Sequence, residues 1–272
     1  MPPGSSEPAP TGTAGRLASS PTPLVFAHRG SSAALPEHTL DAYLRAIDEG
    51  ADGLECDVRL TRDGHLVCIH DRRLDRTSNG RGRVSAATLE ELGRLDFSSW
   101  HPETTAISNG VLTLDRLITA AREAGRPLRL LIETKHPNRY GGAVEEALVA
   151  LLRWHGLRGG ATGGVSVAVM SFNPLALRRV RQLAPGVPTV YLFEVVTPGV
   201  RDGRPPWHTG VLGPGVKALR ARPELVRRAH ERGHQVYVWT VNTREETDLA
   251  ISLGVDGIIT DRPAYVLQRL GR

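Results

Sequence analysis

Short apolar runs with strand character alternate along this chain with segments that have the periodicity of amphipathic helices. Such alternation favours a parallel sheet, because helices supply the long crossover connections between parallel strands. Eight runs have strand character: 24–28, 53–60, 128–133, 165–170, 188–193, 215–218, 235–241 and 256–260. Eight such strands predict an α/β fold of the (β/α)8 TIM-barrel type. A doubly wound open sheet is the alternative, but no glycine-rich phosphate loop follows the first strand.

Helical patterns lie between these runs, and several of them end at a glycine. They are predicted near 39–50, 113–125, 142–155, 174–184, 223–232, 243–253 and 263–270. After the second strand the pattern breaks, because residues 72–112 are irregular and rich in turn formers, with one short helix near 88–95. Long loops in compact domains are often functional. We therefore predict a small insertion at about residues 72–112, which projects from the ends of the strands.

The first 23 residues are rich in Pro, Gly, Ser, Ala and Thr and have no hydrophobic periodicity. This composition cannot bury a core, so residues 1–23 are predicted to be a disordered tail and 24–272 the barrel domain. The start lacks the basic residues and apolar block of a secretory signal, so we expect a cytoplasmic protein. No apolar run approaches the roughly 20 residues of a membrane-spanning helix.

The charge is modestly basic, with a net value of +5 and a pI of about 9.7. Arginine supplies nearly all of the positive charge, since Lys135 and Lys217 are the only lysines. A basic balance is compatible with nucleic acid, a membrane surface or phosphorylated substrates. Because no dense basic tract or basic amphipathic helix is present, scattered surface charge and a small anionic substrate are favoured over nucleic acid.

Residues 53–71 read as two strands joined by a tight turn at Asp63-Gly64, followed by His70 and an aspartate. Side chains alternate faces along a strand, so Glu55 and Asp57 share one face. Two acids that converge with a histidine at strand ends indicate a hard-metal site beside a proton-transfer group. The alternative is an edge hairpin whose polar residues face water.

Other polar residues also fall at the ends of predicted strands, where the active sites of such barrels lie. His28 and Arg29 follow the first strand, Glu133 and Lys135 end the third, and Trp239 is late in the seventh. This coincidence predicts one shared site at the carboxyl ends of the strands.

The residue types in this predicted site suit phosphodiester chemistry. Glu55, Asp57 and Glu133 are hard oxygen ligands for Mg²⁺ or Ca²⁺, and no Cys-His cluster with zinc spacing is present. A divalent ion there would polarise a phosphoryl oxygen. Positive side chains at positions 29 and 135 could hold the other phosphate oxygens. The histidines at positions 28 and 70 could act as proton donor and acceptor, in either order.

A series of short motifs carries a resemblance to a known family. In chain order they are His28-Arg29-Gly30, Pro36-Glu37-His38-Thr39, Glu55-x-Asp57, Thr61-x-Asp63-Gly64, His70-Asp71, Leu74-x-Arg76-Thr77, Gly80-x-Gly82, Glu133-Thr134-Lys135, Trp239-Thr240-Val241-Asn242 and 254–263. Their joint order and spacing resemble the glycerophosphodiester phosphodiesterase family over about residues 24–270. The resemblance implies cleavage of glycerophosphodiesters to sn-glycerol 3-phosphate and an alcohol.

The resemblance also implies roles for particular residues. The matching acids bind the metal, the matching histidines form the catalytic pair, and Arg29 binds phosphate. One departure is His38, where the family usually has Asn; we interpret it as a supporting residue that affects specificity more than catalysis. Another is Leu112, where the family usually has Pro, which concerns only a loop shape.

Several residues carry weaker predictions. Trp239 would line a glycerol pocket or simply pack, and Phe172 and Glu194 fall at strand ends with little further signal. Asp261 is predicted to cap the helix that starts at Pro263. The two cysteines, Cys56 and Cys68, are predicted to be buried apolar residues whose sulfurs point apart, so that no disulfide forms.

Two other functions remain open at this stage. One is a lysophospholipase D-like activity on longer lipids, which would need an exposed apolar rim at the barrel mouth, from residues 95–112 or 194–214. The other is a barrel that binds phosphodiesters without turnover.

Overall fold

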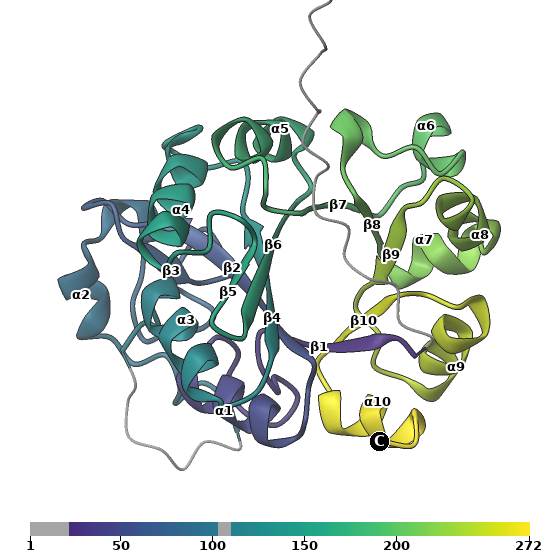
Figure 1. Cartoon of the computed structure of the whole chain (residues 1–272). Helices are drawn as coiled ribbons and strands as arrows, with labels where there is room; N and C mark the ends of the chain where they lie inside the picture. Colours follow the sequence, from purple (N-terminus) through teal and green to yellow (C-terminus); the bar gives the residue numbers. More distant parts are fainter. Residues whose placement is uncertain (1–21, 103–109) are drawn as a thin grey trace, which may run out of the picture.

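The computed structural model describes residues 22–102 and 110–272, and it shows a closed parallel barrel with helices outside it (Figure 1). The barrel strands are β1 (Leu24–His28), β2 (Gly53–Leu60), β4 (Leu128–Thr134), β6 (Val165–Ser171), β7 (Thr189–Phe193), β8 (Val211–Pro214), β9 (Gln235–Val238) and β10 (Gly257–Thr260). The predicted (β/α)8 barrel is therefore confirmed. The predicted tail lies, apart from its last two residues, outside the described residues.

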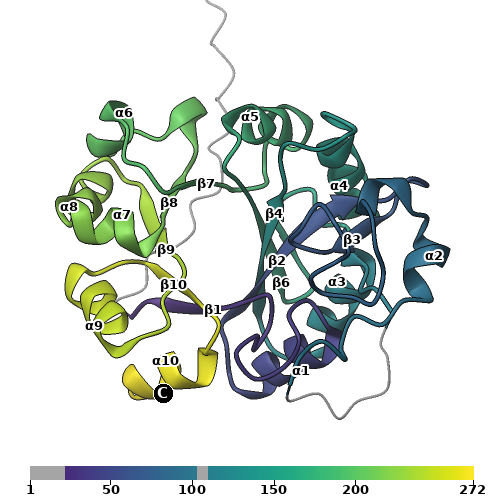
Figure 2. The same ribbon diagram turned by 180° about the vertical axis from the view of Figure 1, so that it is seen from behind.

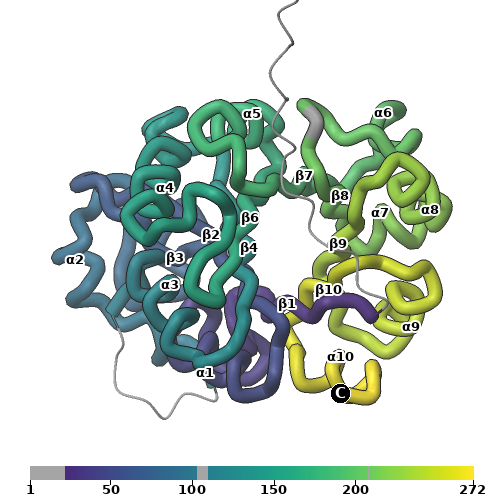
Figure 3. Tube along the Cα trace, viewed as in Figure 1, coloured from purple at the N-terminus to yellow at the C-terminus, as the bar shows by residue number. Residues whose placement is uncertain are grey.

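The barrel closes because the first strand pairs with both the second and the last. Leu24 pairs with Gly257 of β10, while Phe26 pairs with Gly53 of β2, all in parallel register. Figure 3 shows this closure as purple β1 lying beside yellow β10. Residues far apart in sequence, such as His28 and Asp261, thereby come to one rim.

The outer layer consists of helices that pack their apolar faces on the strands. Their bounds are α1 (Leu40–Asp48), α3 (Leu114–Glu123), α4 (Ala143–Trp154), α5 (Pro174–Leu183), α6 (Pro198–Arg201), α7 (Val216–Ala221), α8 (Glu224–His230), α9 (Arg244–Leu253) and α10 (Pro263–Arg269). Thr39, Thr113 and Thr243 cap three of these helices with side-chain oxygens that accept backbone N–H bonds. Along the described chain, we find no helix with the length and apolar character needed to span a membrane.

Apolar side chains fill the barrel interior below the rim. The inner cluster comprises Phe26, Leu131, Ala168, Met170, Val190, Leu192, Val211, Tyr237 and Ile259. The barrel is thus a packed core rather than a pore, and polar chemistry is confined to the strand ends.

The sixth barrel strand was wrongly placed at 215–218. The structure puts β8 at Val211–Pro214 and begins helix α7 at Val216. The sequence pattern misleads here because Gly213 and Pro214 normally break strands. At Gly213 the neighbouring β7 packs so closely that an added Cβ would lie 2.7 Å from the side chain of Leu192.

The segment after β2 forms the predicted hairpin and a small insertion. Strand β3 (Leu66–Cys68) pairs antiparallel with β2, and the 3-10 turn η1 (Val84–Ala86) and the predicted short helix, α2 (Leu89–Gly93), follow. Figure 2 shows this part beside α3 and α4. It has its own apolar cluster of Val67, Ile69, Leu74, Val84, Leu92 and Phe97.

The two cysteines are free and buried as predicted, but their sulfurs do not point apart. Both belong to the same apolar cluster, and the Cys68 side chain and burial raise the pKa of Cys56. The prediction was wrong because it extended strand alternation from Cys68 to His70, whereas β3 ends at Cys68. Val58 pairs with Cys68 across the hairpin, which places Cys56 and Cys68 on the same outer face.

Candidate active site

Of the eight predicted site residues, all but the fully buried Asp57 line one cavity of about 160 Å³ at the carboxyl ends of the strands. Its lining includes His28, Arg29, Glu55, His70, Glu133, Lys135 and Trp239. Phe172 and Glu194, which carried only weak signals, also line it. Met170, Leu192 and Ile259 form an apolar part of the wall that sequence reasoning did not single out, because they look like ordinary core residues.

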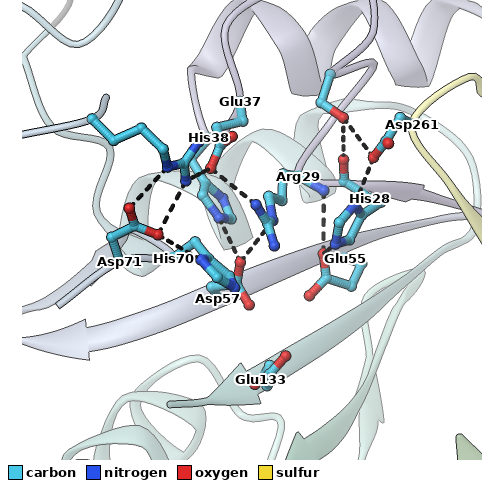
Figure 4. Close-up of polar contacts among 12 residues, drawn as sticks. His28, Arg29, Glu37, His38, Glu55, Asp57, His70, Asp71, Glu133 and Asp261 are labelled. Atoms are coloured by element: carbon cyan, nitrogen blue, oxygen red, sulfur yellow. Dashed lines mark hydrogen bonds and ion pairs between the residues drawn. The ribbon is translucent and has the colours of Figure 1, made fainter. Parts of the chain in front are cut away.

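Three buried carboxylates form the centre of the site. Glu55 and Asp57 come from β2, and Glu133 comes from β4, where it pairs in register with Asp57. One oxygen of each lies within 4.8 Å of the others. Figure 4 shows Glu55 and Asp57 on one strand, with Glu133 on the strand beside it. Strand alternation accounts for this grouping, since positions 55 and 57 share a face.

The electrostatics of this group favour a bound cation. Burial and the charge of Asp57 raise the pKa of Glu133 to about 8 and the pKa of Glu55 well above its usual value. Burial would also raise the pKa of Asp57, but the positive charges of Lys135 and Arg29 hold it well below its usual value. Two carboxyl groups with raised pKa values thus lie beside a third whose pKa is low. A divalent ion bound by all three would neutralise their negative charge. The residues present therefore fit a hard divalent cation.

His28 is held at the edge of the carboxylate group by a second acid. Its Nδ1 lies 2.6 Å from Oδ1 of Asp261, and its Nε2 lies 3.9 Å from Oε2 of Glu55. Asp261 also accepts bonds from Ser32 Oγ at 3.0 Å and Asn242 Nδ2 at 2.5 Å. These bonds fix the ring and leave Nε2 facing the cavity.

This contact corrects the prediction that Asp261 caps the last helix. The N-cap position of α10 is Arg262, while Asp261 faces His28. The side chain of a residue between a strand and a helix can point toward the start of the helix or toward the mouth of the barrel. Here the pairing of β10 with β1 carries Asp261 to the end of the strand that holds His28.

His70 is held in the same manner by its neighbour. Its Nδ1 lies 2.7 Å from Oδ1 of Asp71, and Arg76 donates two bonds to the Asp71 carboxylate. Burial lowers the pKa of His70 to about 4, so its ring is neutral at pH 7. Arg59 donates two bonds to the backbone oxygen of His70, at 2.9 and 2.6 Å. Figure 4 shows His28 and His70 at opposite ends of the group of acids.

The two predicted phosphate-binding cations also contact the acids. Arg29 Nε lies 3.0 Å from Asp57 Oδ2, and its NH1 donates to Glu37 at 3.1 Å. Lys135 Nζ lies 2.9 Å from Asp57 Oδ1 and 2.8 Å from Glu133 Oε1. Arg29 has a φ of 59°, a left-handed conformation that is uncommon for a non-glycine residue and marks a constrained site.

His38, the departure from the family pattern, lies buried directly behind Asp57. Its Nε2 is 2.9 Å from Asp57 Oδ2, and its Nδ1 is 2.8 Å from the hydroxyl of Tyr43. That hydroxyl in turn donates to the backbone oxygen of Glu55 at 3.1 Å. The His38 imidazole therefore connects α1 to β2, the strand that carries Glu55 and Asp57, without lining the cavity.

Trp239 contributes to an aromatic wall on the other side of the cavity. Its indole N–H donates to the backbone oxygen of Gly213 at 2.8 Å, and its ring meets Phe172 edge to face at 5.3 Å. The hydrogen bond and the ring contact fix the orientation of a flat apolar surface opposite the acids.

The fold and this site define a (β/α)8 barrel with three buried carboxylates that fit a cation at its carboxyl rim. Comparison with known proteins narrows this class. The model of the glycerophosphoryl diester phosphodiesterase family matches residues 28–265. The chain belongs to this family.

Individual relatives agree with the assignment. The chain is 47% identical over 248 residues to the "Probable glycerophosphodiester phosphodiesterase 1" of Mycobacterium tuberculosis (strain ATCC 25618 / H37Rv), covering 89% of this chain and 90% of the relative. It is 35% identical over 258 residues to a glycerophosphodiester phosphodiesterase of Bacillus subtilis (strain 168), covering 92% and 87%. Among solved structures, an Oleispira antarctica phosphodiesterase in complex with the product sn-glycerol-3-phosphate has the same fold, with a TM-score of 0.78, 24% identity and coverage of 92% and 98%.

Proposed function

We propose that this chain hydrolyses glycerophosphodiesters to sn-glycerol 3-phosphate and an alcohol, with a divalent cation, Mg²⁺ or Ca²⁺, as its cofactor. Family membership supports the reaction class, and the M. tuberculosis and B. subtilis relatives carry that activity in their names. The Oleispira structure supports the product, because that protein holds sn-glycerol-3-phosphate. The proposed partner is therefore a small phosphodiester.

The observation that carries the proposal is the placement of two histidines around one acidic centre. Each ring has a carboxylate at Nδ1, from Asp261 for His28 and from Asp71 for His70. A carboxylate there fixes the ring orientation and favours the tautomer with its proton on Nδ1. Both rings are thus positioned for proton transfer through Nε2 at one substrate.

The chain's own residues supply the rest of the chemistry. We infer that one of the two histidines, His28 or His70, takes the proton of the hydroxyl that attacks the phosphorus atom. The other histidine protonates the leaving alcohol oxygen. Arg29 and Lys135 line the cavity and provide positive charge for the phosphodiester anion. A divalent cation held by the three carboxylates would polarise a phosphoryl oxygen when bound.

Trp239 completes the proposed site as a wall for the substrate. Its ring is fixed by Gly213 and Phe172 and faces the cavity opposite the charged groups. We propose that the carbon skeleton of the glycerol packs on this ring, because a polyol presents C–H groups on the side away from its hydroxyls.

The test is release of glycerol 3-phosphate from glycerophosphocholine and glycerophosphoethanolamine with Mg²⁺, with Ca²⁺ and with EDTA. We expect release with at least one cation, none with EDTA, and none from His28→Ala. His65→Ala is the matched control, because His65 is exposed and lies outside the cavity. EDTA-insensitive release, or full release by His28→Ala, would contradict the cation and histidine roles.

A second candidate function is turnover of lysophospholipids, favoured by exposed apolar side chains beside the cavity. Phe172 is 42% exposed at the cavity edge, and Val195, which follows Glu194, is 75% exposed. Such side chains could contact an acyl chain. A higher kcat/KM for a lysophospholipid than for glycerophosphocholine would identify the lipid as the substrate. No turnover of either would indicate a barrel that binds without catalysis.

A further inference from the structure

A second concave site, separate from the catalytic cavity, is lined by four arginines. We call it the arginine pocket, and it is lined by Arg59, Leu60, Arg72, Arg83, Val84, Ser85, Asn138, Arg139 and Tyr140. Its volume is about 120 Å³. Nothing in the proposed reaction uses these arginines.

Three segments of the chain build this pocket. Arg59 comes from the end of β2, on the same strand face as the catalytic acids. Arg72 and Arg83 come from the insertion, where the N–H of Val84 donates to the backbone oxygen of Arg72 at 3.1 Å. The loop after β4 closes the pocket, because the hydroxyl of Tyr140 donates to the backbone oxygen of Ser85 at 2.7 Å.

Three of the four arginines in the arginine pocket lack an ion-pair partner: none of the described acidic side chains lies within ion-pair distance of Arg72, Arg83 or Arg139. The fourth, Arg59, lies near the charges of Asp57, Asp71 and Glu133. Neighbouring arginines of the same insertion are paired: Arg73 lies 3.1 Å from Asp75, and Arg76 lies 2.8 Å from Glu37. Arg94 of the insertion is also paired, with Glu90, whereas the described acids leave Arg81, outside the pocket, unpaired like Arg72 and Arg83.

Arg59 is half-buried, whereas Arg72, Arg83 and Arg139 are exposed at the pocket. An anion among these guanidinium groups would reduce the repulsion between their like charges.

We propose that the arginine pocket binds a phosphate monoester dianion, either free or carried by the alcohol part of a substrate. Guanidinium groups bind phosphate oxygens bidentately, and several of them around one concave site suit a dianion. The volume accommodates one phosphoryl group, and the four arginines gather in one pocket rather than along a stripe that could follow a nucleic-acid backbone.

The pocket is connected to the catalytic site through one side chain. The Arg59 guanidinium that faces the pocket also donates both of its bonds to the backbone oxygen of His70. The His70 side chain lines the catalytic cavity. A substrate whose alcohol carries a second phosphate could thus be cleaved beside the His70 side chain. Its second phosphate would lie in the arginine pocket.

Binding is tested by titrating the full chain with inorganic phosphate in EDTA by isothermal calorimetry. EDTA removes any cation from the catalytic cavity, where Arg29 and Lys135 could still bind phosphate. The double variant Arg72→Gln, Arg83→Gln leaves both of these residues unchanged, so binding that it loses belongs to the arginine pocket. We expect saturable binding of one phosphate, weakened at least tenfold in this double variant. Arg81→Gln is the matched control, because Arg81 is exposed in the same insertion but does not line the pocket. No saturable binding, or equal binding by the double variant, would overturn the proposal.

A kinetic comparison identifies the source of the phosphate. The substrates are glycerophosphocholine and a glycerophosphodiester whose alcohol carries a phosphate monoester. A tenfold loss of kcat/KM in the double variant for the second substrate alone would identify a substrate phosphate. If both substrates are unaffected while calorimetric binding is lost, free phosphate is the ligand. This proposal rests on the proposed function only for the substrate arm, because calorimetry needs no turnover.

Discussion

Nδ1 of His28 lies 2.6 Å from Oδ1 of Asp261, across 233 residues of sequence, because the barrel closes by pairing the first strand with the last. The carboxylate fixes the plane of the ring and the position of its free nitrogen. His28 therefore depends on Asp261 for its orientation in the cavity.

Replacing Asp261 by Asn is expected to lower kcat by on the order of 10²-fold, because general acid–base catalysis by a positioned histidine contributes about 10²–10⁴. KM should change little, since Asp261 acts through His28. The measurement is steady-state release of glycerol 3-phosphate, with the melting temperature recorded to exclude unfolding. Ser32→Ala is the matched control: it removes one bond to Asp261 and one to the backbone oxygen of His28 but leaves the contact between the His28 ring and Asp261, so kcat should fall only a few-fold. A kcat for Asp261→Asn equal to that of Ser32→Ala would contradict the assigned role.

Glu37 gives the fold an acid-sensitive ion pair near the site. Its side chain is 12% exposed, and Arg76 and Arg29 bind it at 2.8 and 3.1 Å. Burial alone would raise the pKa of Glu37, but the bonds from Arg76 and the charge of Arg29 lower it to about 2. Between its usual value of about 4.5 and 2, the unfolded chain binds more protons than the folded chain. The stabilisation from Glu37 is therefore present above pH 4.5 and is lost as the pH falls toward 2.

The expected effect of Glu37→Gln is a loss of on the order of 1–2 kcal/mol of unfolding free energy at pH 7, after allowing for solvent screening. The variant should also lose less stability than the wild type between pH 4.5 and pH 3. Urea unfolding at these three pH values measures both. Glu90→Gln serves as the control, because the exposed pair of Glu90 with Arg94 should contribute little. Parallel pH curves for wild type and Glu37→Gln would show that Glu37 is not the sensitive group.

Much of the site could be predicted from strand alternation and strand ends. Glu55 and Asp57 had to share a face, and His28, Glu133 and Lys135 had to reach the same rim if the strands were parallel. Each of these inferences needs only local periodicity and one topological rule. The structure places all five residues together.

The missed features depend on packing between distant segments. Whether Asp261 caps α10 or faces His28 is decided by the β1–β10 pairing, and no local pattern contains that information. Gly213 belongs to β8 because it pairs with Leu192 of β7, and that pairing is not visible in the local sequence. Whether Cys56 and Cys68 lie on the same face depends on where β3 ends. Periodicity locates the end of a strand only to within a few residues.

Close packing at the start of β2 provides a test of the barrel itself. A Cβ at Gly53 would lie 2.4 Å from the backbone oxygen of Arg129 and 2.6 Å from the ring of Phe26. Gly53→Ala should therefore destabilise the fold by about 1–3 kcal/mol or more, measured by urea unfolding. The matched control is Gly93→Ala, where an added Cβ meets no described atom within 4 Å, so stability should be equal or slightly higher. Similar unfolding midpoints for both variants would mean that β2 and β4 are spaced differently from the structure.

The carboxylate group should respond to divalent cations without any substrate present. Ligands that bind only the folded state stabilise it by about 2.7 kcal/mol at 100 times the dissociation constant, which is roughly 5–10 °C for a domain of this size. We expect Mg²⁺ or Ca²⁺ to raise the melting temperature of the wild type by this amount and to have little effect on Glu55→Gln. Glu194→Gln is the matched control, because Glu194 lines the same cavity outside the three-carboxylate group and its variant should keep the full shift. Because burial and the charge of Asp57 raise the pKa of Glu55, its cation-free carboxyl ionises less readily than an ordinary one, and glutamine should replace it with little change in stability. Equal shifts in Glu55→Gln and the wild type would place the cation elsewhere and remove the three carboxylates from the proposed mechanism.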